Sequence, residues 1–353
     1  MNLPVITAVT AWVPSAIPLS RWTAIESALR TSGHSGWDAW AKSWHPNDGY
    51  WLEARPGGRT GGSPRVHPDI APPDPACAVP VETGTDLSGL AAKMANAIRA
   101  TRPKDARPVD VVMFCHSTPD EHVSTTIAGR LCAEVGTPCF PFSISQQHGA
   151  SPFTALRLAS DLFMGEPDVH TILIVAAEKW CPPFSRMFEH GIVQGDAAGA
   201  LLVERAERGT AGLQLLDTET RHVPAHSGHH ATTAPDARAF TLVSMIGFFL
   251  AHHGLRPDDI GEVLGHPGAP SLSDAVCRFL CRPDAAVQHQ LCVHLGAAES
   301  IVRLAQALGC FACLRHHRML LWGYGIGGFV GTALLEARGT PFLYRQGDVR
   351  PIS

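Results

Sequence analysis

Apolar positions along the chain follow two spacings in turn, which predicts alternating strands and helices. Residues 3–12 alternate and are rich in β-branched side chains, which predicts a strand. From Thr85 the apolar residues recur every three or four positions, which predicts a helix with one buried face. Residues 109–117 and 170–180 are continuous apolar runs, as expected for strands covered on both faces. This alternation indicates an α/β fold with a mostly parallel sheet.

The segment SQQHGASPFTAL, residues 145–156, predicts a strand end, a sharp turn and the start of a helix. Leu156, Ala159, Leu162 and Phe163 have helical spacing, so one face of that helix should be buried. Free N–H groups and the helix dipole stabilise an anion at such a helix start, where many enzymes carry a nucleophile. The turn contains His148, Gly149 and Ser151, and it contains no cysteine.

Two later segments are similar to each other, which indicates an internal duplication. GDAAGALLVERA (195–206) and GFVGTALLEARG (328–339) share a glycine-bearing turn and an apolar strand with a glutamate near its end. The pattern in the second half predicts helices at 242–253, 272–280 and 299–308, and strands at 290–296 and 319–328.

Composition limits the classes of function. The chain has 353 residues, 45% of them hydrophobic and 17% charged, as in a globular protein with a sizeable core. A net charge of −4 gives no reason to expect nucleic-acid or anionic-membrane binding. The first residues lack the features of a signal peptide, and the apolar run 242–251 is too short to span a bilayer, so we expect a cytoplasmic protein. Residues 37–75, rich in Trp, Gly, Pro and Arg, predict an irregular segment that shapes a binding site.

The ten cysteines are spread along the chain, and we expect no disulfide framework and no metal. Cys115, Cys139 and Cys292 lie in apolar runs and are expected to be small buried hydrophobes. Cys310 and Cys313 form a single C-x-x-C without a second pair at zinc spacing. The histidine-rich stretch 221–230 is expected to be a polar surface loop.

An ordered series of motifs resembles the thiolase superfamily, in particular its β-ketoacyl-ACP synthase III-like branch. The motifs are CHSTPDEHVST (115–125), GASPFTALRLA (149–159), VAAEKW (175–180), QGDAAGALLVE (194–204), GHPG (265–268) and GYGIGGFVGTALLE (323–336). The resemblance implies a five-layered αβαβα sandwich of two duplicated halves, residues 1–207 (with the irregular cap segment, about 37–75) and 208–353. It also implies a dimer that uses acyl-CoA or acyl carrier protein as substrate and needs no cofactor.

In that family a cysteine at the helix start is acylated, while a histidine and an asparagine act on the second thioester. Here the cysteine position falls on Gly149 or His148, depending on the direction of counting. The resemblance assigns the histidine to His266. Where the asparagine is expected, the chain offers His294, Gly296 and Glu299. The glycine-rich loop remains, and the resemblance implies that its N–H groups, among them those of Gly325, Gly327 and Gly328, help to form an oxyanion hole.

Three interpretations of this altered site stay open. In the first interpretation, Ser151 replaces the cysteine and His266 acts as its base. Alternatively no acyl-enzyme forms, and His148 or His266 acts as general base for direct transfer, with Glu299 orienting a histidine or taking the acceptor's proton. In the third, the chain is a silent subunit beside a cysteine-bearing homologue. Our working hypothesis is an acyltransferase of secondary metabolism, because chain initiation by decarboxylative condensation needs groups that this sequence lacks.

Overall fold

The structure is a computed structural model that describes residues 3–21, 77–119, 126–136, 139–180, 186, 192–207, 209–223, 237–266, 269–282, 293–310, 317–325 and 327–345. The strands are β1 (Pro4–Trp12), β2 (Ala16–Pro18), β3 (Ala78–Pro80), β4 (Val111–His116), β5 (Phe140–Ser145), β6 (Thr171–Glu178), β7 (Val193–Gln194), β8 (Ala197–Arg205), β9 (Leu213–His222), β10 (Glu262–Leu264), β11 (Val293–His294), β12 (Arg318–Tyr324), β13 (Phe329–Ala337) and β14 (Phe342–Arg345). The α-helices are α3 (Leu87–Thr101), α4 (Ile127–Val135), α5 (Ser151–Gly165), α6 (Ala237–His252), α7 (Pro270–Phe279) and α8 (Glu299–Leu308). Short 3-10 turns are η2 (His148–Ala150), η4 (Pro257–Asp259) and η6 (Gly296–Ala298).

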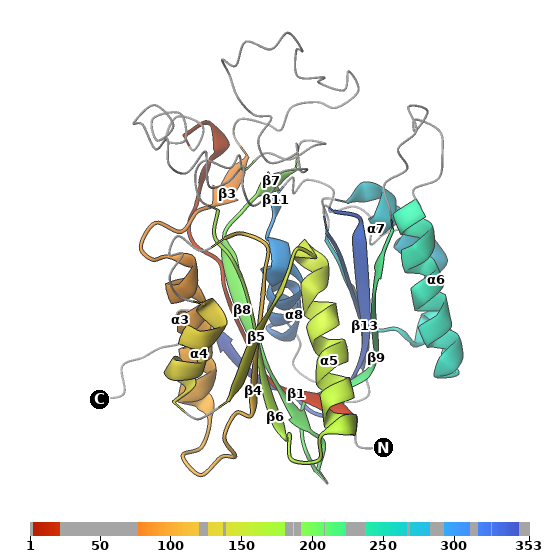
Figure 1. Cartoon of the computed structure of the whole chain (residues 1–353). Helices are drawn as coiled ribbons and strands as arrows, with labels where there is room; N and C mark the ends of the chain where they lie inside the picture. Colours follow the sequence, from red (N-terminus) through yellow and green to blue (C-terminus); the bar gives the residue numbers. More distant parts are fainter. Residues whose placement is uncertain are drawn as a thin grey trace.

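The elements form five layers, as the resemblance implied. Helices α3 and α4 cover one outer face, α6 and α7 cover the other, and α5 and α8 lie between the two halves of the sheet (Figure 1). Alternate residues of a strand face different layers. Met113 of β4 and Met319 of β12 face the central helices, whereas Phe114 faces α3 and α4, and Leu320 faces α6 and α7. Both faces of each half are therefore buried, which explains the continuous apolar runs.

The large sheet is mixed, so the expectation of a mostly parallel sheet was wrong. Its strand order is β10-β12-β13-β9-β1-β8-β6-β4-β5, with β14 paired to β1. The pairs β4–β5, β4–β6, β10–β12 and β1–β14 are parallel, whereas β1–β8, β6–β8, β1–β9, β12–β13 and β9–β13 are antiparallel. Strands β8 and β13 each run antiparallel to both of their neighbours.

The two halves meet edge to edge through a short pairing. Val5 lies opposite Gln214 and Ile6 opposite Leu213. The two similar sequence segments form β8 and β13, which have equivalent neighbours: β8 pairs with β6 and β1, and β13 pairs with β12 and β9. The division at residues 207 and 208 stays a prediction.

Most predicted elements are found near their expected positions. Leu156, Ala159 and Phe163 of α5 are buried, and Leu162 packs partly buried against the same core. The strand expected at 290–296 is described only as the two residues of β11. The irregular segment 37–75, Cys292 and Cys313 lie outside the described residues.

Cys139 corrects an expectation. It is only partly buried, and its sulfur is joined to that of Cys132 in a disulfide, with Cα atoms 6.0 Å apart. The two cysteines are seven residues apart, one near the end of α4 and one just before β5. The pattern of apolar residues does not reveal that these two positions lie side by side.

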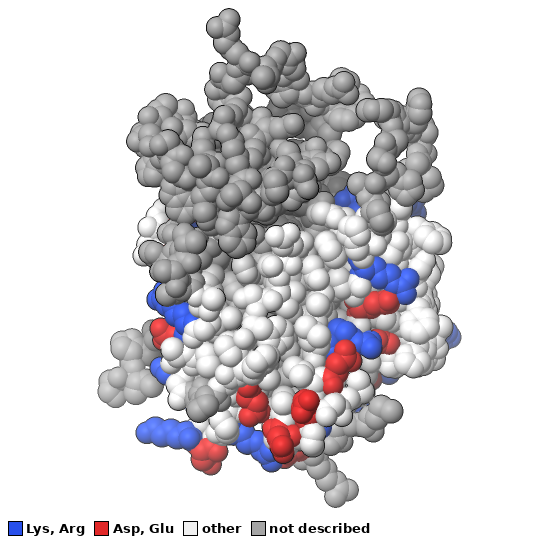
Figure 2. Space-filling view, viewed as in Figure 1, with Lys and Arg blue, Asp and Glu red and all other residues white. Residues whose placement is uncertain are grey.

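Charge is spread over the surface without a large area of one sign on the visible described face. Acidic and basic side chains lie interspersed in the lower part and at the right edge of Figure 2. None of the helices in the described ranges combines the length and apolar character needed to cross a membrane.

Candidate functional site

Two helix starts form the base of the site. In each, a 3-10 turn of three residues leads directly into an α-helix: η2 precedes α5, and η6 precedes α8. The first residue of each turn has positive φ, 48° at His148 and 56° at Gly296. Left-handed backbone is strained for a residue other than glycine, so His148 is held there by its surroundings.

Three histidine rings from distant parts of the chain lie in contact at this point, with their planes tilted. The ring centroids of His148 and His294 are 4.4 Å apart, and those of His294 and His266 are 4.3 Å apart. The rings are buried, with exposures of 4% for His148, 1% for His266 and 0% for His294. The Tyr324 ring closes one side, 5.4 Å from His266 and 4.9 Å from His294. The structure therefore brings together His148, His266 and the asparagine-region residues that the sequence singled out.

Glu299, the first residue of α8, is the carboxylate of the cluster. Its Oε1 lies 3.4 Å from Nδ1 of His266 and accepts a 2.8 Å hydrogen bond from Nε of Arg303, while its Oε2 accepts one of 2.7 Å from the N–H of Leu295. Burial alone would raise the pKa of Glu299, but His266, Arg303 and His294 outweigh it and hold the pKa well below its usual range. An ionised Glu299 favours a proton on Nδ1 of His266, which leaves Nε2 as the basic atom.

Hydrogen bonds also define the tautomers of the other two rings. Nε2 of Gln194 donates to the carbonyl of Gly195, so its Oε1 faces Nε2 of His148 at 2.9 Å as an acceptor. His148 then carries its proton on Nε2. Nδ1 of His294 accepts a 2.7 Å hydrogen bond from the N–H of Gly296, which places the proton of His294 on Nε2.

Both of these rings are kept neutral. Burial is the main cause that lowers the pKa of His148, and the neighbouring His266 lowers it further. The groups that raise this pKa, and that are outweighed, are Glu178, Gln194 and Glu299. Burial, with His266 and His148 beside it, holds the pKa of His294 well below its usual value. The cluster thus combines two neutral imidazoles with one carboxylate-paired imidazole.

Gln194 was missed by sequence reasoning, although it begins the QGDAAGALLVE motif. Its carbonyl accepts a 2.9 Å hydrogen bond from Arg186, which also makes a two-pronged ion pair with Asp196 at 2.7 and 2.8 Å. Both charged groups are fully buried. The pair holds the backbone of residues 194–196, and through it the amide that orients His148. The glutamine is 46 residues from His148, so local spacing carries no signal of the contact.

Gly149 leaves no space for a side chain. A Cβ there would lie 2.5 Å from the carbonyl oxygen of Tyr324 and 3.0 Å from Cε1 of His294. The side chain that this turn places next to the His294 ring is therefore that of His148.

The glycine-rich loop packs directly against this turn. A Cβ on Gly323 would lie 2.6 Å from the carbonyl oxygen of Gly149, and one on Gly325 would lie 2.3 Å from that of Gln147. The N–H of Gly325 donates to the carbonyl of Phe329, and that of Gly328 donates to the carbonyl of Gly325. Gly327 accepts a hydrogen bond from His222 at its carbonyl. The oxyanion role of these three glycines stays a prediction.

Ser151 faces its own turn. Its Oγ donates a 2.8 Å hydrogen bond to the carbonyl of His148. The hydroxyl also interacts with the thiol of Cys115, whose pKa burial raises to about 12. Cys115 is fully buried, as expected for a small core residue, and remains a neutral thiol at neutral pH.

Comparisons with known proteins agree with this architecture. No protein-family model matches the chain. It is 25% identical over 251 residues to the β-ketoacyl-[acyl-carrier-protein] synthase III of Rhodospirillum rubrum, covering 63% of this chain and 75% of that protein. It is 28% identical over 148 residues to the 1,3,6,8-tetrahydroxynaphthalene synthase of Streptomyces peucetius subsp. caesius, covering 36% and 39% of the two chains.

Among solved structures, the acyltransferase ChlB3 superposes with a TM-score of 0.68 at 17% identity and covers 96% of this chain and 99% of its own. The ketoacyl synthase III of Pseudomonas aeruginosa PAO1 superposes with a TM-score of 0.64 at 16% identity, covering 95% and 98%. The chain is therefore similar in sequence to ketoacyl synthase III proteins and shares the fold of these solved structures, which is the thiolase fold.

Proposed function

We propose that the protein is an acyltransferase that moves an acyl group from a CoA or acyl-carrier-protein thioester to an acceptor without a cysteine acyl-enzyme. The observation that carries the proposal is the Glu299–His266 pair, placed in ring contact with His294 where α5 and α8 begin. A histidine whose Nδ1 lies beside an ionised carboxylate presents its Nε2 as a general base.

The proposed step needs only groups of this cluster and the two substrates. Nε2 of His266, which is buried and has no hydrogen-bond partner among the described residues, takes the proton of the acceptor. The acceptor attacks the thioester carbonyl, the C–S bond breaks, and the thiolate leaves with the proton that His266 returns. In the proposed step the Nε2 proton of His294, which interacts with the carbonyl of Tyr324 in the structure, is shared with the thioester carbonyl oxygen, the task of the missing asparagine.

The relatives support this class of chemistry. One similar fold belongs to an acyltransferase, and one curated relative is a synthase whose name denotes a tetrahydroxynaphthalene rather than a fatty acid. We place the chain with such secondary-metabolism proteins, acting as a cytoplasmic homodimer or in a heterodimer with a cysteine-bearing homologue.

One observation favours a second candidate function, a silent partner subunit. The three rings pack on one another with at most 4% exposure, and the Cβ position at Gly149 is filled by Tyr324 and His294. A silent partner subunit needs only the fold and its interaction surface, so a site that is closed by side chains does not impair its role.

Acceptor-dependent thiol release separates the candidates. The purified protein is incubated with acetyl-CoA or a longer acyl-CoA and hydroxylamine as a general acceptor, and free CoA and intact protein mass are measured. The first proposal expects CoA release without a mass adduct, about 10²–10⁴-fold slower in His266→Gln because a general base typically contributes that factor. Ser151→Ala should keep the wild-type rate.

A matched control is His170→Gln, a partly buried histidine beside β6 at the end opposite Glu178. Full activity of His266→Gln, or a stable adduct that Ser151→Ala abolishes, would contradict the proposal. No release by the wild type, together with co-purification of a cysteine-bearing homologue, would establish the silent partner instead.

A further inference from the structure

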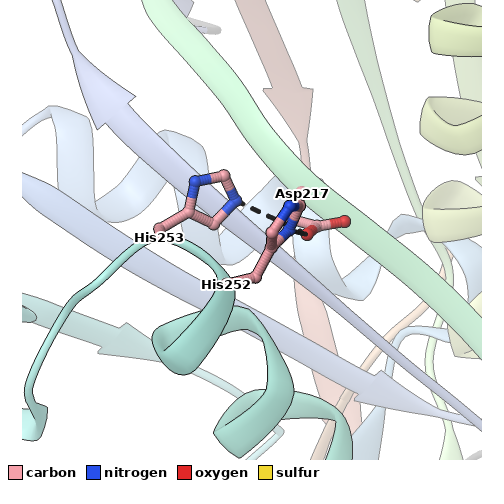
Figure 3. A group of neighbouring side chains, drawn as sticks. All are labelled: Asp217, His252 and His253. Carbon is pink, nitrogen blue, oxygen red and sulfur yellow. Dashed lines mark hydrogen bonds and ion pairs between the residues drawn. The ribbon is translucent and has the colours of Figure 1, made fainter.

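A second cluster of ligand-type side chains lies on the outer side of the C-terminal half. Asp217 of β9, His252 at the end of α6 and the following His253 point toward one another (Figure 3). Nδ1 of His252 is 3.2 Å from Oδ2 of Asp217, and Nε2 of His253 is 3.5 Å from the same oxygen. The three atoms lie within 4.8 Å of one another.

These separations match the edges of a metal coordination sphere. Zinc–nitrogen and zinc–oxygen bonds of about 2.0–2.2 Å at tetrahedral angles place neighbouring ligand atoms about 3.3–3.6 Å apart. Two imidazoles and one carboxylate are the donor set that zinc and related divalent transition metals accept, with a further position open to water.

The environment favours a cation at this point. His252 is the last residue of α6, and Gly254, at φ 63°, follows where the helix ends. The carbonyl end of a helix carries partial negative charge, which adds to the charge of Asp217. The N–H of Thr218 donates to Oδ1 of Asp217 at 3.0 Å, and this leaves Oδ2 to the histidines.

His253 supplies an independent observation. Its Nε2 is shielded from solvent and has no hydrogen-bond partner among the described residues, although it lies next to the carboxylate. A shielded ring nitrogen is expected to have a hydrogen-bond partner. Coordination to a metal would satisfy it.

We propose that Asp217, His252 and His253 bind a divalent transition metal of the zinc class, which fastens the end of α6 to β9. The site shares no residue with the histidine cluster at α5 and α8, so it is independent of the proposed acyl transfer. Its consequence is structural: the bound metal stabilises the folded chain, since it binds the folded form in preference to the unfolded one.

The test uses the full chain, freed of metal by a chelator. Binding of ZnCl2 is measured by titration calorimetry, and binding of Co²⁺ is measured by visible absorption. One equivalent should bind and raise the melting temperature. Asp217→Asn and His253→Gln should each weaken binding by more than about 100-fold, because each removes a direct ligand and even outer-shell changes cost 10–100-fold.

The histidine-rich segment 221–230 provides a matched control for adventitious binding. A triple variant, His226→Ala, His229→Ala and His230→Ala, should keep the one-equivalent site and its thermal shift. Loss of binding in this variant, or unchanged affinity in Asp217→Asn and His253→Gln, would overturn the proposal. Circular dichroism of each variant, measured without metal, shows whether a lost site reflects a lost fold.

Discussion

Helices α5 and α8 begin with the same backbone conformation, but the first side chain of each helix is chemically different. Each follows a three-residue 3-10 turn with positive φ at its first residue, His148 in one and Gly296 in the other. The first residue of α5 is Ser151, which bonds its own turn, whereas that of α8 is Glu299, which pairs with His266. The duplicated architecture therefore supplies two equivalent anion-stabilising positions, and this chain places its charge at the second.

The second residues of the two turns differ in the space around them. Ala297 carries a real Cβ, whereas a Cβ at Gly149 would collide with the carbonyl oxygen of Tyr324. The strained residue of the first turn is consequently the one whose side chain enters the site. The contrast between the turns can be tested one position at a time.

The largest effect is expected from Glu299→Ala. The substitution takes the carboxylate from the partly buried Arg303 and deprives the buried N–H of Leu295 of its acceptor. A buried donor left without a partner costs about 1–3 kcal/mol and a hydrogen bond to a charged group contributes about 1.5–3 kcal/mol, so the combined loss should be about 3–5 kcal/mol. Denaturant unfolding at pH 7 measures the loss. A cost below that of the Ser151 variant described below would show that the second helix start does not hold the charge as described.

Gly149→Ala should come next. Its Cβ must displace the Tyr324 carbonyl or the His294 ring, and overpacking of this kind costs about 1–3 kcal/mol. The matched variant in the other turn is Ala297→Gly, which creates no clash: it adds chain entropy, worth about 0.5–1 kcal/mol, and removes one buried methyl group, worth about 0.8 kcal/mol. Equal costs for the two variants would remove the steric distinction between the turns.

Lowering the pH should destabilise the protein through its buried neutral histidines. The pKa values of His148 and His294 are lowered in the folded state, so the unfolded chain binds more protons below its ordinary histidine pKa of about 6.5. Stability is therefore complete above that pH and falls as the pH drops below it, by up to about 1.4 kcal/mol per pH unit for each ring.

The variant His148→Asn isolates the contribution of the first turn to this pH dependence of stability. Asparagine tolerates positive φ and does not titrate, so the variant should show a smaller fall in unfolding free energy between pH 7 and pH 5. An unchanged slope would mean that His148 is already protonated in the folded protein.

The smallest effect is expected from Ser151→Ala. It removes one neutral hydrogen bond to the carbonyl of His148, worth about 1 kcal/mol. Thiol release from acyl-CoA should stay at the wild-type rate, in contrast to His266→Gln. A loss of activity with intact stability would restore Ser151 as the nucleophile.

Sequence patterns predicted the helices well because each buries one face. The predicted helix at 299–308 coincides with α8, and the buried side of α5 is the one expected from Leu156, Ala159 and Phe163. Strand direction was predicted less well, since periodicity shows that a strand is buried and does not show which neighbour it pairs with. The antiparallel direction of β8 and β13 was therefore not predicted.

The candidate site was predicted in part. His148, His266 and Glu299 were singled out by their motifs, and the structure brings them together with His294. The roles of Gln194 and Arg303 depend on contacts made in the folded chain. Gln194 contacts His148, which is 46 residues away in the sequence, and Arg303 contacts the carboxylate of Glu299 one helical turn away. The ring contacts between the histidines likewise join three segments that sequence spacing does not relate.

The pairing of β14 with β1 has a consequence for how the chain folds. Ala8, in the first strand, lies beside Phe342, in the last one, and β1 also holds β8 and β9 in place. The centre of the sheet is thus completed by residues that follow β1 by more than 300 positions in the sequence. Contacts of such sequence separation close slowly, because the entropy of a long loop must be lost first. A chain emerging from the ribosome therefore exposes part of one edge of β1 until β14 has been made, and chaperone binding is expected to concentrate in that interval.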